Sequence, residues 1–256
     1  MTLIRCVDVE TSGLDPAVHR ICEIATVDVI VSPKLLMPSI MEVERGEMWS
    51  SLVNPERAIP PEASAVHDIV DEMVKDAPKI GELSGKINFV HGKDGPPDYW
   101  CAHHNRFDMQ FINPPGAVWL DTYRIALWLW PSAPEHKLAT LRYWLNLKLG
   151  LDLTVHKDSV IRSHRALWDA YICAAVLRRA FTSDATIEQM LDVSSQPALL
   201  PRFTFGEHAM KPIEEVPSGY LDWILSPKGI KNNVDVAHTA FAELQRRRNL
   251  ERLQSS

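Results

Sequence analysis

The sequence predicts an α/β fold built on a mixed β-sheet, and two observations lead to this prediction. Short apolar segments rich in Val and Ile come first along the chain, as expected for strands. From residue 99 onward, such segments alternate with segments whose apolar residues recur at helical spacing. The 256 residues, 46% of them hydrophobic, suffice for one large domain with a small appendage.

Three strands are expected in the first quarter of the chain, where apolar segments are bounded by turn-forming residues. They are residues 3–10, 21–31 and 48–53. Pro33 and Pro38 make residues 32–46 an expected excursion in the connection to the third strand, because proline interrupts strand pairing.

Helices are expected where prolines open a segment or where apolar residues recur every three or four positions. Pro60-Pro61 opens the first such segment. The clearest helix covers residues 166–181, where apolar residues recur on one side. The remaining expected elements are strands at residues 99–103 and 118–121 and helices at residues 122–130, 137–147 and 234–253.

The acidic balance of the chain restricts how it could bind nucleic acid. A formal net charge of −6 and a pI of about 5.9 exclude a protein that binds nucleic acid by being basic over its whole surface. They do not exclude a nuclease, because the metal ligands of such an enzyme are themselves carboxylates. Phosphate-loop and dinucleotide-binding sites lack support, since neither G-x-x-x-x-G-K-[ST] nor G-x-G-x-x-G occurs.

Cysteine placement and the lack of long apolar runs indicate the cellular compartment. The four cysteines are scattered and form no C-x-x-C pair, so we expect reduced, buried thiols rather than disulfides or a zinc site. The chain reaches Asp8 before a signal-peptide apolar region could develop, and no apolar run approaches the roughly 20 residues that span a bilayer. We therefore expect a cytoplasmic protein without membrane contact.

Two acids on the first expected strand indicate a metal site. Asp8 and Glu10 are two positions apart, so strand alternation places both side chains on one face, roughly 7 Å apart. Two buried carboxylates need a neutralising partner, and Mg²⁺ or Mn²⁺ prefers oxygen ligands. The alternative is an edge strand with solvated acids, which Val7 and Val9 on the other face make less favourable.

Two further acids are expected near the same sheet edge. Asp108 follows the strand at residues 99–103, and Asp169 lies in the first turns of the helix at residues 166–181. An acid at a helix N-terminus is also an ordinary choice that suits the helix dipole, so Asp169 alone would not indicate a site.

Taken in order, three motifs make a specific pattern. They are Asp8-Val9-Glu10-Thr11-Ser12-Gly13, then Phe107-Asp108, then His164-x-Ala-x-x-Asp169. The pattern resembles the DEDD exonucleases of the histidine subtype, which are DnaQ-like, and most closely the exonuclease X group. The resemblance implies a ribonuclease H-like fold: a mixed five-stranded sheet flanked by helices, with a small C-terminal appendage.

The resemblance also implies the domain organisation. Residues 1–183 would form the exonuclease domain, with a soft boundary between residues 184 and 200. Residues 184–256 would form a C-terminal segment that ends in a helix. This segment resembles the tail of the exonuclease X group through Phe203-Thr204-Phe205-Gly206 and Pro217-Ser218-Gly219-Tyr220-Leu221-Asp222-Trp223.

The chain departs from the family pattern in two places. The second motif usually reads His-Asn-x-x-Phe-Asp, whereas this chain has His103-His104-Asn105 before Arg106-Phe107-Asp108. His104 thus stands at the usual Asn position, which puts the contact of that Asn in doubt but leaves the Asp108 ligand in place. Residues 34–47 also resemble an insertion before the third strand.

The family implies a metal-dependent 3′–5′ exodeoxyribonuclease that acts on a DNA 3′ end, expected to be single-stranded, in DNA repair. Two Mg²⁺ or Mn²⁺ ions would be held by four carboxylates, and His164 would be the general base. The implied catalytic residues are Asp8, Glu10, Asp108, Asp169 and His164, of which the four acids are the metal ligands. The implied substrate-binding residues are Thr11, Ser12, Gly13, Leu14, His67 and Phe107.

Alternatives stay open at this point. Leu14 could simply anchor its own turn, His67 could cap a local helix, and His164 could be a surface histidine beside a helix. The substrate could be RNA, as for an exoribonuclease of the RNase T or oligoribonuclease sort. The chain could also be a polymerase-associated proofreading subunit with minor turnover, although a complete set of acids and base argues for catalysis.

Overall fold

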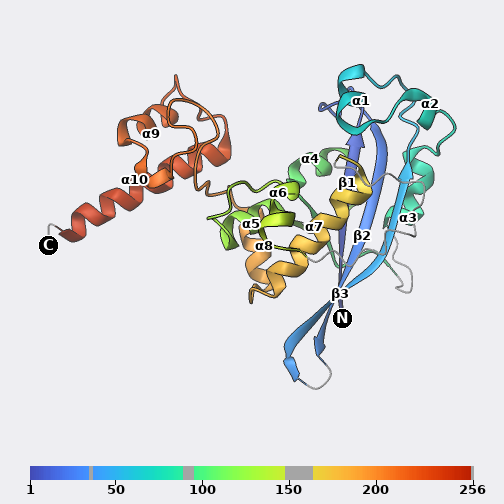
Figure 1. Ribbon diagram of the computed structural model, residues 1–256, viewed down its shortest axis with the longest axis horizontal. Coiled ribbons are helices and arrows are strands. Elements are labelled where there is room, and N and C mark those ends of the chain that lie inside the picture. Colours follow the sequence, from blue (N-terminus) through green and yellow to red (C-terminus); the bar gives the residue numbers. More distant parts are fainter. Residues whose placement is uncertain (35–36, 89–94, 148–163, 255–256) are drawn as a thin grey trace.

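A five-stranded mixed sheet forms the centre of the protein (Figure 1). The computed structural model describes residues 1–34, 37–88, 95–147 and 164–254, with side chains at residues 33–42 left aside. The strand order is β3-β2-β1-β4-β5, with β1, β2 and β3 antiparallel and β4 and β5 parallel to β1. The strands are β1 Thr2–Thr11, β2 Ile21–Lys34, β3 Met37–Leu52, β4 Tyr99–Ala102 and β5 Trp119–Asp121. The predicted α/β class with a mixed five-stranded sheet is confirmed.

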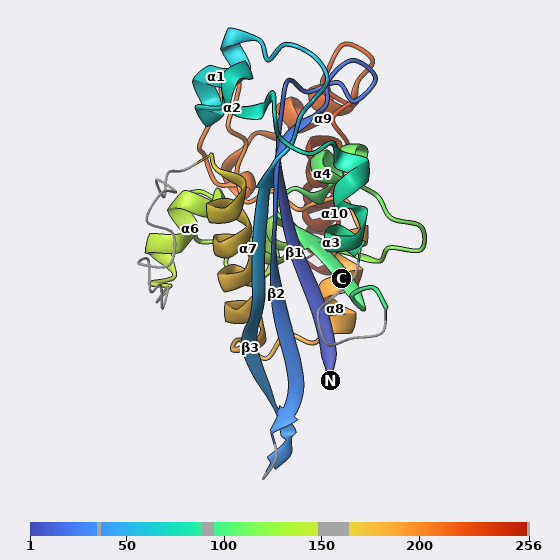
Figure 2. The same ribbon diagram turned by 90° about the vertical axis from the view of Figure 1, so that its right-hand side faces the viewer.

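The second and third strands are longer than the sequence predicts. Residues 32–46, expected as an excursion, and the expected insertion at residues 34–47 belong to a long hairpin in which β2 and β3 extend past the rest of the sheet (Figure 2); residues 35–36 lie outside the described residues. Both prolines are tolerated for a physical reason. The pairing of β1 with β2 ends at Thr2 and Val31, so Pro33 has no neighbour on that side, and Pro38 lies on the edge strand.

Helices cover both faces of the sheet. On one face, apolar residues of α5 (Thr122–Leu129), α6 (Leu138–Trp144), α7 (Ala166–Phe181) and α8 (Ile187–Ser195) share a core with Ile4, Cys6 and Val27. On the other face, α3 (Ser84–Asn88) and α4 (Asn105–Phe111) pack against the sheet, and Figure 2 shows α6 and α7 on the side opposite α3 and α4. Three short helices, α1 (Pro61–His67), α2 (Asp71–Val74) and η1 (Ile80–Leu83), follow β3.

Side chains of β1 alternate between the two faces of the sheet, and this alternation determines which of them pack against α7. Ile4 and Cys6 belong to the core shared with α7, whereas Val7 and Val9 belong to the core on the opposite face. Asp8 and Glu10 continue the row of Ile4 and Cys6, so the face of β1 that packs on α7 turns from apolar to acidic at its carboxyl end.

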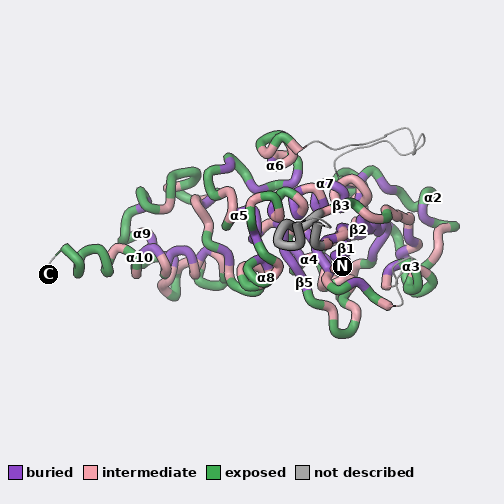
Figure 3. The backbone as a smooth tube through the Cα atoms, turned by 90° about the horizontal axis from the view of Figure 1, so that it is seen from below, coloured by how far each residue is buried: buried purple, intermediate pink, exposed green. Residues whose placement is uncertain are grey.

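The C-terminal residues form a second, smaller core. The 3-10 helix η3 (Ile213–Glu215) and helices α9 (Ser218–Leu225) and α10 (Val234–Gln254) bury Phe203, Leu221 and Ala240. Figure 3 shows these elements extending from the sheet, with the end of α10 exposed. Met190 of α8 still belongs to the first core, so that core extends into residues 184–200, where the sequence predicts a soft boundary.

One buried arginine joins the two cores. Arg124 of α5 pairs with Asp121 at 2.5 Å and with Asp235 of α10 at 3.2 Å, and its side chain is 3% exposed. Because a buried guanidinium needs full pairing, this contact favours one placement of α10 against α5.

Among the helices of the described ranges, none is both long and apolar enough to cross a membrane.

Candidate active site

Three carboxylates converge where the carboxyl end of β1 meets the first turn of α7. Oxygen atoms of Asp8, Glu10 and Asp169 all lie within 4.8 Å of one another. The two strand acids face α7 because of the alternation described above, and Asp169 lies in the first turn of that helix. The packing of α7 on β1 thus brings together Asp8 and Asp169, which are 161 positions apart in the sequence.

Asp108 supplies a fourth carboxylate from α4, the helix that follows β4. It lies in the first turn of α4 and is 4% exposed. Asp108 is outside the group of three, but after burial its charge is the strongest influence that raises the pKa of Asp8. Three of the four acids that the sequence motifs indicate therefore converge, and the fourth, Asp108, is close enough for its charge to act on Asp8.

The four acids are held in an environment that disfavours their charged forms. Burial, together with the charges of Asp108, Glu10 and Asp169, holds the pKa of Asp8 well above its usual range. Burial and the charge of Asp169 raise the pKa of Glu10 to about 8, and burial raises the pKa of Asp169 to about 6. Oxygen donors that repel one another in this way fit a divalent cation, which would neutralise them.

This repulsion predicts how a cation should stabilise the protein at different pH values. In the metal-free protein, the pKa of Glu10 is about 8 rather than the 4.5 of a free side chain, so its contribution to stability is present below about pH 4.5 and is lost as the pH rises through 8. We expect Mg²⁺ to raise the thermal unfolding temperature more near pH 8 than near pH 6. Differential scanning fluorimetry measures the shift, and Glu10→Gln should reduce the difference. Equal shifts at both pH values in the parent protein would contradict this account.

His164 lies directly beside this cluster. It is exposed, and its backbone N–H donates to Oδ2 of Asp169 at 3.1 Å. Its φ of 62° is in the left-handed region, which non-glycine residues rarely adopt. The third motif thus holds the candidate base beside a candidate ligand, with the imidazole open to solvent.

The loop after β1 is a tight turn with one exposed apolar side chain. Thr11 Oγ1 donates to the Gly13 carbonyl at 2.8 Å, and Ser12 is 1% exposed. A Cβ at Gly13 would lie 2.5 Å from the ring of His19, so a larger residue there would displace that ring. Leu14 at the tip is 79% exposed, which leaves its side chain free to contact a ligand.

His67 and Phe107, the other predicted substrate contacts, are held by the fold. His67 is 3% exposed: its Nδ1 accepts from the Ile69 N–H at 3.1 Å, and its Nε2 lies 3.3 Å from the Thr11 carbonyl. Since Nδ1 is the acceptor, Nε2 carries the proton and donates to Thr11. Phe107 is half-buried and packs on Phe111, with 5.2 Å between ring centroids. His67 therefore supports the turn after β1 from beneath.

The unusual His104 faces away from the core. It has a φ of 67° at the start of α4, and its ring stacks on Tyr123 with 3.6 Å between centroids. The neighbouring Asn105 is 5% exposed, and its Nδ2 lies 3.5 Å from the Leu120 carbonyl. The amide of this motif is thus directed to β5, while Asp108 keeps its place in the cluster.

All four cysteines are free and buried, as the sequence predicts. The sulfur atoms of Cys6, Cys101 and Cys173 lie within 4.8 Å of one another. Burial and the neighbouring thiol of Cys173 hold the pKa of Cys101 well above its usual range, so this thiol stays protonated. The trio belongs to the apolar core that α7 shares with the sheet.

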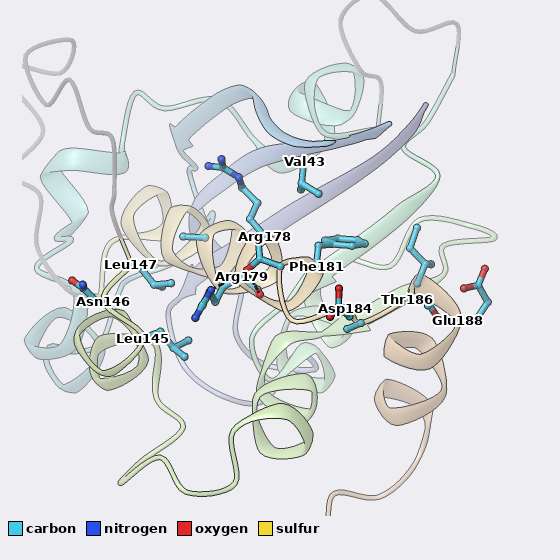
Figure 4. Close-up of a pocket in the computed structure, with 14 residues that line it drawn as sticks. Val43, Leu145, Asn146, Leu147, Arg178, Arg179, Phe181, Asp184, Thr186 and Glu188 are labelled. Carbon is cyan, nitrogen blue, oxygen red and sulfur yellow. Dashed lines mark hydrogen bonds between the residues drawn. The ribbon is translucent and has the colours of Figure 1, made fainter. Parts of the chain in front are cut away.

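A cavity of about 1070 Å³ lies at the other end of α7 (Figure 4). Val43, Leu145 and Phe181 line it, with charges of both signs at Arg179 and Asp184. A rise of about 1.5 Å per residue along α7 separates Asp169 from Phe181 by roughly 18 Å, so the cavity does not belong to the acidic cluster.

Two residues beside the cluster were not predicted from the sequence. Arg165, next to His164, forms two hydrogen bonds with the buried carboxylate of Glu23 on β2. The available signal for Glu23 was an acid in a mostly apolar strand, since a buried carboxylate needs a partner, and Asp28 on the same strand gives the same signal.

Comparisons with known proteins show which family the chain resembles. The RNase T exonuclease family model matches residues 6–177. Exodeoxyribonuclease 10 of Escherichia coli (strain K12) is 34% identical over 237 residues, which cover 91% of this chain and 92% of that protein. DNA polymerase III subunit epsilon of Treponema pallidum is 30% identical over 176 residues, 65% of this chain and 70% of that protein.

Solved structures give a similar result. The structure of exonuclease X in complex with 5′-overhanging duplex DNA matches with a TM-score of 0.59 and 31% identity. The match covers 75% of this chain and 99% of that chain. A full-length 3′-exonuclease matches with a TM-score of 0.52 at 15% identity, which indicates a shared fold.

Proposed function

This chain belongs to the RNase T exonuclease family, and from that premise we propose that it removes nucleotides from DNA 3′ ends by metal-dependent phosphodiester hydrolysis. The predicted family and the enzyme class, an exonuclease, are confirmed. The observation that carries the proposal is the convergence of Asp8, Glu10 and Asp169 within 4.8 Å. DNA repair is the process we propose for such an activity.

DNA rather than RNA is the proposed substrate. The relative named as an exodeoxyribonuclease aligns with 91% of the chain, so the similarity reaches well into residues 184–256. The similarity to the polymerase subunit covers only 65% of the chain. The exonuclease X structure was solved with DNA. A relative whose similarity extends into the C-terminal segment supports a shared substrate class.

The acidic cluster fits a pair of divalent cations, which we propose to be Mg²⁺ or Mn²⁺. Asp8, Glu10, Asp108 and Asp169 would hold them, because the burial and mutual repulsion of these carboxylates call for positive charge. Bound there, the cations would lower the pKa of water and offset charge that develops on the phosphate. They would also change the local charge from strongly negative to one that tolerates a phosphodiester.

His164 is the proposed general base. Its side chain is exposed and its backbone is bonded to Asp169, so the imidazole is available to take a proton from the attacking water, a role that histidine most often fills in enzymes. Asp169 accepts the backbone N–H of His164, which holds the backbone that carries the imidazole next to this carboxylate.

Substrate binding is proposed for the turn after β1 and its surroundings. Leu14, which is 79% exposed, would pack against the terminal bases, and the backbone of Ser12 and Gly13 would lie along the terminal nucleotide. Thr11 and His67 would hold this turn in place through their hydrogen bonds. Phe107, half-buried before Asp108, would contact the last sugar or base.

The direct test compares substrates of one sequence. Single-stranded DNA, single-stranded RNA and a DNA duplex with a 5′ overhang, each labelled at the 5′ end, are incubated with Mg²⁺ or with a chelator. We expect stepwise shortening of DNA with Mg²⁺ only, fastest on the single strand. Shortening of RNA alone would replace the proposal with an exoribonuclease, and no shortening of any substrate would refute it.

A further inference from the structure

A buried ion pair anchors the segment that carries His164. Arg165 donates from Nε to Oε2 of Glu23 at 2.9 Å and from Nη2 to Oε1 at 2.7 Å. The Glu23 side chain is 6% exposed and that of Arg165 is 23% exposed. A two-point contact between a guanidinium and a carboxylate fixes orientation as well as distance, and lysine cannot reproduce it.

Glu23 also caps α7. Its Oε2 accepts the Ala166 N–H at 3.0 Å, at the first residue of that helix. Arg165 at the N-cap position makes no side-chain cap of its own, so β2 supplies the acceptor that the local sequence lacks. A negative charge at this end also suits the helix dipole. The start of α7 is therefore tied to the sheet.

His164 depends on this anchor. Its φ of 62° is unfavourable for an L-residue and persists only where the surrounding contacts hold it. The contacts described for its segment are the N–H bond to Asp169 and the Arg165–Glu23 pair one residue later. Loss of the pair would let the backbone at His164 relax away from the acids.

The Glu23–Arg165 pair adds little net charge next to the acidic cluster, because its two charges are opposite. Glu23 is the cross-strand partner of Glu10, and its charge raises the pKa of Glu10 while Arg165 lowers it. Both oxygens of Glu23 are engaged by Arg165 and the Ala166 N–H, so Glu23 is not available as a metal ligand. The role of Glu23 beside the cluster is therefore to hold Arg165 and the start of α7 in place.

We propose that Glu23 and Arg165 are positioning residues that hold His164 where it can accept a proton. The proposal rests on the exonuclease function and on His164 as its base. Neither residue touches the reacting atoms; both act through the backbone before α7.

The test is Arg165→Lys, which keeps the charge and loses the two-point contact. We expect kcat on single-stranded DNA to fall roughly 10–100-fold with little change in KM, because small displacements of a catalytic group have effects of this size. Glu23→Gln should behave likewise. Thermal unfolding of each variant reports whether the fold is kept.

The chain offers a matched control in a second arginine–carboxylate pair, which joins β1 to β2. Arg5 contacts Asp28 with the same two-point geometry, at 2.8 and 2.9 Å, and both residues are buried. Asp28 lies five positions after Glu23 along β2, roughly 17 Å from it. Arg5→Lys should lower the unfolding temperature and leave kcat unchanged. If it lowers kcat as much as Arg165→Lys does, the effect is one of stability and the proposal fails.

A double variant separates positioning from a direct role. Once His164 is alanine, Arg165→Lys should reduce kcat no further, because the residue through which it acts is gone. Losses that multiply in the double variant would overturn the proposal. A parent protein that shortens no DNA would instead refute the exonuclease function, and this outcome is distinct from an active parent whose Arg165→Lys variant keeps full kcat.

Discussion

Asp8→Asn should reduce the rate of DNA shortening by at least roughly 10³-fold. Removal of a single neutral hydrogen-bond donor from a catalytic site already costs up to about that factor, and loss of a charged metal ligand should cost at least as much. Asp8 is the acid whose pKa responds to all three others, so it is at the centre of the cluster. Asparagine keeps the size of the side chain and removes the charge that a cation needs. The rate is measured with a labelled single strand at saturating Mg²⁺.

The same variant should be at least as stable as the parent without metal. Burial and repulsion raise the pKa of Asp8, so its ionised form destabilises the metal-free fold, and a neutral amide removes that repulsion. Asp184→Asn, an exposed acid just beyond the far end of α7, is the matched control and should keep full activity. Parent-like digestion by Asp8→Asn would show that the metal site is wrongly assigned, and a lower unfolding temperature would show that the cluster is not repulsive.

His164→Ala should slow turnover by roughly 10²–10⁴-fold, the usual contribution of a general base. Its side chain is exposed and the contact to Asp169 is made by its backbone, so alanine removes the imidazole and leaves that hydrogen bond in place. Metal binding should therefore persist. Metal binding is measured as the increase in thermal unfolding temperature that Mn²⁺ causes, and kcat is measured on the same variant.

A second histidine serves as the control for this variant. His19→Ala changes an imidazole in the neighbouring loop, where the ring packs on Gly13 and contacts Ser12 at 3.3 Å. We expect it to affect KM more than kcat, because it supports the substrate turn. A His164→Ala variant with parent kcat would exclude His164 as the base, and loss of the Mn²⁺ effect would make it a ligand.

The parts of the fold that are local in sequence could be predicted. The strand at β1 and the helix at α7 follow from apolar periodicity, and α7 was predicted with its observed bounds. Asp8 and Glu10 share a face because of strand alternation alone. The prediction that Asp108 and Asp169 lie near these two acids came from the resemblance to the family. The packing of α7 on β1 cannot be read from either segment by itself.

What the sequence could not supply depends on tertiary placement. Pro33 and Pro38 argued against a strand, but a proline is tolerated where the neighbouring strand has ended or the edge is free. His67 was predicted as a substrate contact, and only the fold shows its ring beneath the Thr11 carbonyl. The Glu23–Arg165 pair joins residues 142 positions apart, a distance at which no local signal exists.

The central claim is that the acidic cluster hydrolyses the last phosphodiester at a DNA 3′ end. A single strand labelled at its 3′-terminal nucleotide tests this in one turnover, with excess enzyme and with or without Mg²⁺. The account predicts that the first labelled product is a mononucleotide, formed with Mg²⁺ and absent with chelator or in Asp169→Asn. Labelled fragments longer than one nucleotide, or release that continues in the chelator, would contradict it.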